Sequence, residues 1–109
     1  MSTVTLTLPT ISVVDQLVVA NQSLQIIARG GDWAAPDVDV TIANNVFEWS
    51  GSLAAGVWHV ARLRWNYAAG GCSEWTGFQF TTDGSGDYGP KSPALRPHPR
   101  VYDFRVVVV

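Results

Sequence analysis

Few side chains in this chain of 109 residues are of types that do chemistry, and they are not arranged for it. The two histidines, His59 and His98, are not at metal-ligand spacing from each other or from the single cysteine, Cys72, so we expect no zinc site. Cys72 follows two glycines and has no neighbouring histidine to activate its thiol, so we expect no nucleophile. His59 lies in a run of strand-forming residues, where we expect it to pack in or beside the core.

One short acidic stretch has part of a metal-binding pattern. Asp83, Ser85 and Asp87 are spaced like the first half of a calcium loop, but the twelfth position is Ala94, where a bidentate glutamate is needed. We interpret the stretch as a solvated linker. The sequence also lacks a glycine-rich phosphate loop and a nucleophile elbow. We therefore expect no enzyme, no catalytic or metal-binding residue and no cofactor.

The remaining chemical signal is aromatic, because five of the residues are tryptophan. We expect Trp49 and Trp65 in the core, and Trp33 and Trp75, which lie in a loop or at a strand end, at least partly exposed. Exposed aromatic rings stack on sugars or anchor protein interfaces. Trp33 and Trp75 are therefore the candidate surface aromatics, and both uses stay open.

Composition limits the class of protein. With 47% hydrophobic residues, the length predicts one domain with its own core. A net charge of -2 argues against nucleic acid as the main partner. No apolar run approaches the ~20 residues that span a bilayer, and the first thirty residues lack the pattern of a secretory signal. We expect no membrane segment and synthesis in a reducing cytosol.

The elements that position these residues are predicted to be strands, because apolar and polar residues alternate along most of the chain. Gly51 and Ser52 are expected to end the short strand predicted over 46–49. The predicted strands are 3–8, 23–29, 38–42, 46–49, 57–67 and 78–82. A spacing of about ten residues per strand is typical of an antiparallel, two-sheet β-sandwich of six or seven strands, so we predict an all-β fold.

The phase of the strand over 57–67 decides which of its side chains are buried. Exposed positions for Arg62 and Arg64 require His59, Leu63 and Trp65 to face inward. We expect this phase, with a bulge near 57–60.

Two runs, from Leu53 to Asn66 and from Gly71 to Thr82, resemble the last two strands of a fibronectin type III domain, a sandwich similar to the immunoglobulin fold. In that family a leucine and a glycine precede an aromatic residue and an alternating strand with arginines. A glycine-containing loop and Ser-x-Trp-Ser follow, which here reads Ser73-Glu74-Trp75-Thr76. Trp58 stands where the family has the tyrosine of its corner motif, so a tyrosine hydroxyl is missing there.

The C-terminal part changes character. We divide the chain into a sandwich over 1–82, a Pro/Gly-rich linker over 83–100 and a β-prone strand or arm over 101–109. An unpaired apolar strand is an aggregation hazard, so we expect the arm to add to a sheet edge of another chain. The expected partner-binding residues are Val101, Tyr102, Phe104, Val106, Val107 and Val108. In the alternative, the strand folds back onto its own sandwich as an extra edge strand.

A lone sandwich without a catalytic cluster indicates a structural or interaction module. The resemblance implies an accessory protein of a tailed-phage virion, made in the host cytoplasm, which decorates a capsid or builds a fibre or neck. Its partners would be other protein subunits in a homo- or hetero-oligomeric assembly. The alternative is a carbohydrate-binding or host-surface adhesion module that uses exposed aromatics.

Overall fold

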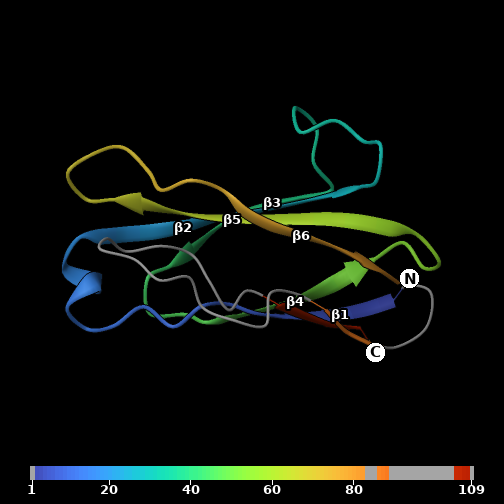
Figure 1. The fold of residues 1–109 in the computed structure, drawn as a ribbon, viewed down its shortest axis with the longest axis horizontal. Coiled ribbons are helices and arrows are strands. Elements are labelled where there is room, and N and C mark those ends of the chain that lie inside the picture. Colours follow the sequence, from blue (N-terminus) through green and yellow to red (C-terminus); the bar gives the residue numbers. More distant parts are fainter. Residues whose placement is uncertain (1, 83–85, 89–104, 109) are drawn as a thin grey trace.

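The computed structural model describes residues 2–82, 86–88 and 105–108. They form two antiparallel four-stranded sheets packed face to face, which confirms the predicted all-β sandwich (Figure 1). One sheet has the strand order β4-β1-β8-β7 and the other has the order β3-β2-β5-β6. The strands are β1 Ser2–Thr7, β2 Val19–Ala28, β3 Val38–Ala43, β4 Glu48–Leu53, β5 Trp58–Tyr67, β6 Thr76–Thr81, β7 Gly86–Tyr88 and β8 Arg105–Val108. A 3-10 turn, η1 (Asp15–Leu17), lies between β1 and β2.

The two strands with most pairing, β2 and β5, form the centre of the second sheet. His59, Ala61, Leu63 and Trp65 on β5 point into the core and are buried, while Arg62 and Arg64 lie on the opposite face and are half-buried. This is the predicted phase. The expected bulge near 57–60 is wrong, because β5 pairs regularly with both neighbours there; the register shifts instead at Val19/Asn21 in β2.

Strand β4 runs through Gly51, so the expectation that Gly51 and Ser52 end a strand over 46–49 is wrong. Gly51 pairs with Val4 on β1, and a Cβ atom added to it would lie 2.5 Å from the indole of Trp49. The indole of Trp49 therefore occupies the space over Gly51. A glycine inside a strand here marks a close approach by a neighbouring ring, not a break.

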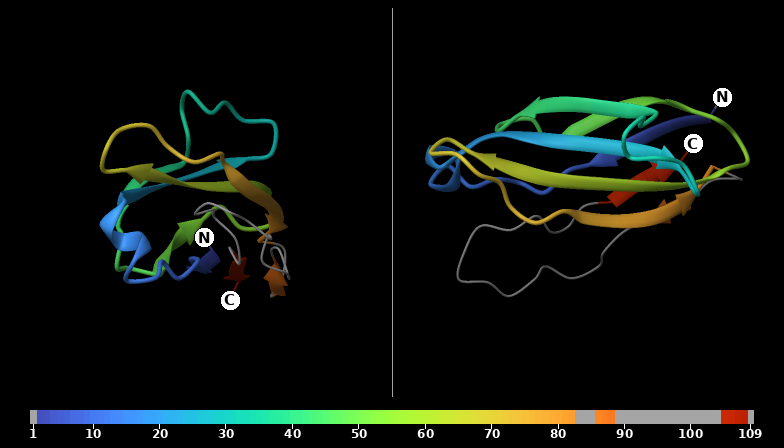
Figure 2. Two further views of the ribbon diagram at one scale, coloured as in Figure 1. Left: turned by 60° about the vertical axis from the view of Figure 1, so that its left-hand side comes forward. Right: turned by 90° about the horizontal axis from the view of Figure 1, so that it is seen from above.

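Residues 105–108 belong to the same sandwich, which corrects the expectation for this part of the arm. Strand β8 pairs with β1 on one side and with β7 on the other. Figure 2 shows β1 and β8 side by side, near the two ends of the chain. Val106 and Val108 are buried in the core, and Val107 faces outward and is 40% exposed. Part of the predicted linker, Gly86–Tyr88, is strand β7. Strand β8 therefore folds back onto its own sandwich, as in the alternative, but it is an inner strand between β1 and β7 and not an extra edge strand.

Val101, Tyr102 and Phe104 lie outside the described residues. The sandwich itself extends beyond the expected boundary at Thr82, because β7 and β8 complete its first sheet.

Candidate interaction surfaces

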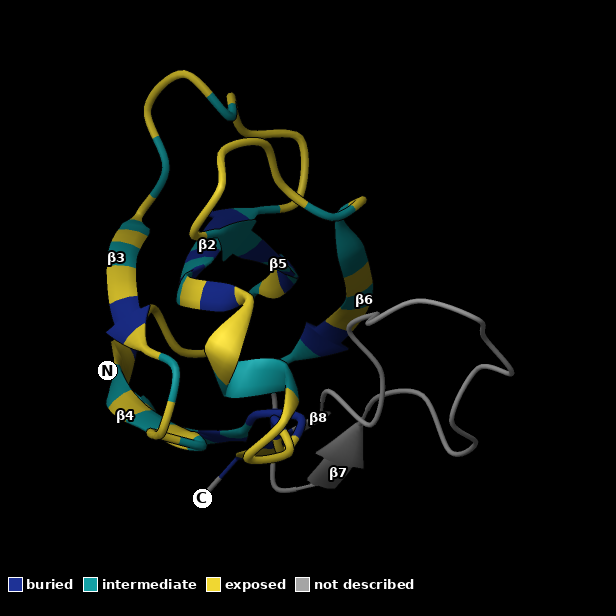
Figure 3. Cartoon of the chain, turned by 90° about the vertical axis from the view of Figure 1, so that its left-hand side faces the viewer, coloured by how far each residue is buried: buried dark blue, intermediate teal, exposed yellow. Residues whose placement is uncertain are grey.

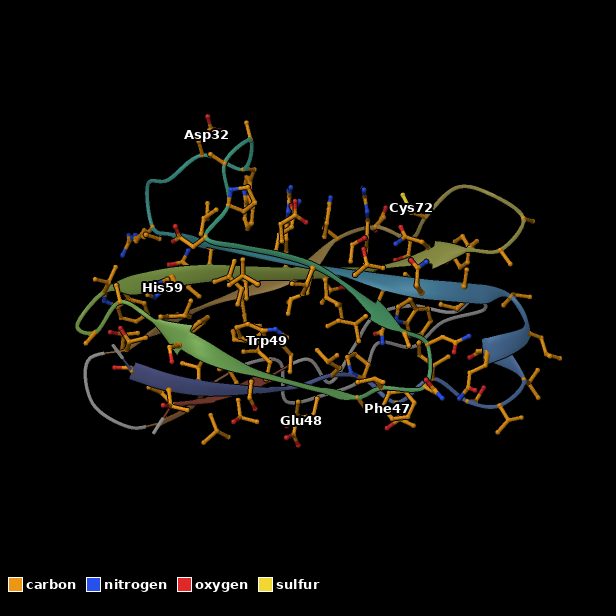
Figure 4. All side chains as sticks on the ribbon, turned by 180° about the vertical axis from the view of Figure 1, so that it is seen from behind. Asp32, Phe47, Glu48, Trp49, His59 and Cys72 are labelled. Atoms are coloured by element: carbon orange, nitrogen blue, oxygen red, sulfur yellow. The ribbon has the colours of Figure 1, made fainter. Side chains whose placement is uncertain are left out.

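The residues that could do chemistry are dispersed in the described ranges, where no group of His, Cys, Asp and Glu side chains could hold a metal ion. Cys72 is exposed in the connection between β5 and β6. His59 points between the sheets at one end of the sandwich, while Asp32 and Cys72 lie above the outer face of the β3-β2-β5-β6 sheet (Figure 4). Among the residues that the structure describes, neither Cys72 nor His59 is therefore grouped with a second catalytic side chain.

His59 is a buried core residue, as its place in β5 predicted. Its ring stacks on Phe80 with the centroids 5.6 Å apart, and its Nδ1 lies 3.0 Å from the carbonyl oxygen of Val57. Burial lowers the pKa of His59, because a charged imidazolium would be desolvated; the Val57 carbonyl and, more weakly, Asp37 act in the opposite direction.

Because the pKa of His59 is lower in the folded chain than in the unfolded one, the unfolded chain binds the proton more readily. The His59 contribution to stability should therefore be fully present above the ordinary histidine pKa of about 6.5 and should be lost as the pH falls below it. Urea unfolding between pH 8 and pH 5 should show a decline that is smaller in His59→Gln. An equal decline in both proteins would contradict this assignment.

Trp33 and Trp75 meet over an arginine on the outer face of the β3-β2-β5-β6 sheet. The guanidinium carbon of Arg62 lies 3.8 Å from the ring centroid of Trp33 and 4.1 Å from that of Trp75. The guanidinium carbon of Arg64 lies 4.2 Å from the Trp75 ring. The Trp75 ring therefore contacts both guanidinium groups. We call Trp33, Arg62, Trp75 and Arg64 the Trp-Arg ladder.

Strand pairing explains why the ladder forms. Arg62 and Arg64 are two residues apart on β5 and so share a face. Gly77 is opposite Arg62 on β6, and an added Cβ there would lie 2.7 Å from the Ala61 carbonyl oxygen. On the other side, Gln25 is opposite Arg62 on β2, and its Oε1 accepts hydrogen bonds from Arg62 Nε and Nη2 at 2.9 and 2.6 Å.

The charge of the ladder is not neutralised locally. Burial lowers the pKa of Arg62, the neighbouring Arg64 cation lowers it further, and Asp39 raises it to a smaller extent. Within residues 2–82, 86–88 and 105–108, neither arginine forms an ion pair, and the buried Nε of Arg64 has no hydrogen-bond partner. The ladder thus holds two cations against indole rings without a direct ion pair among the described residues, and Asp39 acts on Arg62 only through its field.

A second feature is an apolar surface at one end of the sandwich, where the β1–β2, β3–β4 and β5–β6 connections gather (Figure 1). Of the seven large hydrophobic side chains found exposed in the described residues, five belong to the first two of these connections. We call these five the apolar tip: Val13, Val14, Leu17, Val18 and Val46. Val13 and Leu17 are each 79% exposed and Val14 is 74% exposed, and Figure 3 accordingly colours most residues around η1 as exposed.

Hydrogen bonds hold the tip in shape. Asn44 Nδ2 donates to the carbonyl oxygens of Gln16 and Val19 at 3.2 and 2.8 Å, which ties the β3–β4 turn to the β1–β2 connection. The backbone N–H of Ala68, in the β5–β6 connection, donates to the Val18 carbonyl at 2.8 Å. Ile11 is buried beneath the connection and anchors it. The tip is therefore an ordered apolar surface and does not need to fold when a partner binds.

Sequence reasoning found Trp33 and Trp75 but missed what they contact, and it missed the apolar tip. The signal for the tip was present, since the stretch from Val13 to Val18 is apolar without the alternation of a strand. The signal for the ladder was the pair of outward arginines on β5 together with Trp75 just before β6. Neither pattern specifies a spatial neighbour by itself.

No protein-family model matches this sequence, and no curated protein or solved structure matches it. No helix in the ranges that the structure describes is long and apolar enough to cross a membrane. The functional argument therefore depends on the geometry of the two surfaces.

Proposed function

We propose that this protein is a non-enzymatic interaction module that attaches to another protein subunit through its apolar tip. The observation that supports this is the gathering of five of the seven exposed large hydrophobic side chains at one end of the fold. Single exposed aliphatic side chains are ordinary, but a grouped, ordered set costs solubility and marks an interaction site. Each aliphatic side chain buried by a partner would contribute about 1.5–3 kcal/mol.

The chemistry of the tip favours a protein partner. The β1–β2, β3–β4 and β5–β6 connections contain no Lys or Arg, whereas surfaces that attach to lipid usually combine apolar residues with cations. A sugar site would need a free aromatic face. The rings of Trp33 and Trp75 both lie against the guanidinium of Arg62, and Trp75 also lies against that of Arg64. The tip is thus the better candidate contact.

The strand order supports a relation to immunoglobulin-like and fibronectin-like sandwiches. The order β3-β2-β5-β6 corresponds to C′-C-F-G of such domains, and β4-β1 corresponds to E-B, with β8 in the place of strand A. In this correspondence the β1–β2 and β5–β6 connections are the B–C and F–G loops, which bind partners in antibody variable domains. The apolar tip lies at that end.

The assembly we propose is a multi-subunit particle such as a tailed-phage virion, in which the module would decorate the capsid or form part of a fibre or neck. Proteins of this kind act through contacts between subunits and need no catalytic group, cofactor or metal. This setting follows from analogy of fold and size.

Photo-crosslinking in the source cells tests the proposal. A photoreactive residue at position 14 or 17 should crosslink to one and the same protein, whereas the same residue at position 107, outside the tip, should not. Val14→Asp combined with Leu17→Asp should reduce recovery of that protein more than about tenfold, because two apolar contacts are lost. Val107→Asp is the matched control. Crosslinking of equal strength at position 107, or binding to lipid vesicles through position 17, would refute the proposal.

A further inference from the structure

The Trp-Arg ladder is a second surface, separate from the apolar tip, and its two cations form no ion pair with a residue that the structure describes. Among the described residues, Arg62 has one neutral side-chain acceptor, Gln25, and Arg64 has none. Two like charges this close to each other repel, and Arg64 accordingly lowers the pKa of Arg62. An anionic ligand would relieve that repulsion.

The ladder leaves specific donors available to such a ligand. A guanidinium group has all five N–H donors at the edge of its plane, and stacking on indole rings covers the faces of the plane. Gln25 uses the Nε and Nη2 side of Arg62, so the Nη1 side remains. Arg64 is half-buried, with only its Nε fully covered, so its terminal nitrogens are the accessible donors. Planar carboxylates match this fork geometry.

The spacing of the two cations indicates an extended ligand. The guanidinium carbons of Arg62 and Arg64 lie 4.1 and 4.2 Å from the ring centroid of Trp75, so they are at most about 8 Å apart. Alternate residues of an extended peptide are about 6.8 Å apart and point to the same side. We infer that the Trp-Arg ladder binds an extended acidic segment of a partner protein, with carboxylates on alternate residues paired to Arg62 and Arg64.

Nucleic acid fits the ladder less well. Single-stranded nucleic acid is held by free aromatic faces on which bases stack, whereas the rings of Trp33 and Trp75 already lie against Arg62, and Trp75 also lies against Arg64. The chain's net charge of -2 repels a long polyanion more strongly than a short segment in which only two carboxylates meet the ladder. Two cations framed by apolar rings instead suit a short acidic segment, since the rings exclude water and strengthen each charged hydrogen bond.

A synthetic peptide that alternates Glu with Thr, blocked at both ends, tests the ladder by calorimetric titration at low salt. The wild-type protein should bind this peptide and should not bind the version with Gln in place of Glu. Arg64→Gln should weaken binding about tenfold, because one charge-assisted pair is lost. Arg29→Gln removes an exposed cation outside the ladder and should change binding by less than about twofold.

Urea unfolding of both variants should match the wild type, which separates binding from folding. No binding of the Glu peptide at millimolar concentration would overturn the inference. So would an equal effect of Arg64→Gln and Arg29→Gln, or tighter binding of heparin or single-stranded DNA at the same site.

Discussion

Val106→Asp should lower the free energy of unfolding by about 3 kcal/mol or more, because it places a carboxylate in the core without a partner. Val106 is 0% exposed and is paired with Leu6 on β1 and with Tyr88 on β7. Val107→Asp is the matched control, since Val107 is the next residue and faces outward, and it should cost less than about 1 kcal/mol. Urea unfolding of the two variants measures the difference.

Urea unfolding also tests whether β8 pairs within its own chain or is donated by another chain. If β8 belongs to its own sandwich, the unfolding midpoint of the wild-type protein should not depend on protein concentration. A midpoint that rises with concentration, or equal effects of Val106→Asp and Val107→Asp, would contradict the pairing of β8 with β1 in one chain.

Trp65→Ala should destabilise the sandwich by about 3–5 kcal/mol, since it removes the largest buried side chain of the core. Trp65 is 1% exposed, on the inward side of β5. Its indole Nε1 has no hydrogen-bond partner within the residues that the structure describes. Trp65→Phe should therefore lose volume but no hydrogen bond, and should cost clearly less than Trp65→Ala.

Trp58→Ala is the control for Trp65→Ala, because Trp58 lies on the same strand but is 44% exposed on the other face. It should cost less than about 1.5 kcal/mol. A greater loss for Trp58→Ala than for Trp65→Ala in thermal or urea unfolding would mean that β5 has the opposite phase. In that phase Arg62 and Arg64 would be buried.

Local patterns in the sequence were sufficient for the all-β fold and for the phase of its main strands. Alternation of apolar and polar residues depends only on neighbours along the chain, so it identified β1 and the inward side of β5. Charge supported the phase of β5, because Arg62 and Arg64 cannot be buried without partners. Gly51 was misinterpreted because its reason, the indole of Trp49 over it, is a contact in space.

Only the tertiary structure decided where the C-terminal strand pairs and what the exposed aromatics contact. A β-prone segment can add to any free sheet edge, and nothing in residues 105–108 specifies β1 of the same chain, about a hundred residues away. The Trp-Arg ladder likewise joins Trp33, Arg62 and Trp75 from three separate segments. The sequence by itself determined which faces of the strands are apolar, because that information is local. Strand pairing and loop packing decided the partners, because they depend on contacts between residues far apart in the chain.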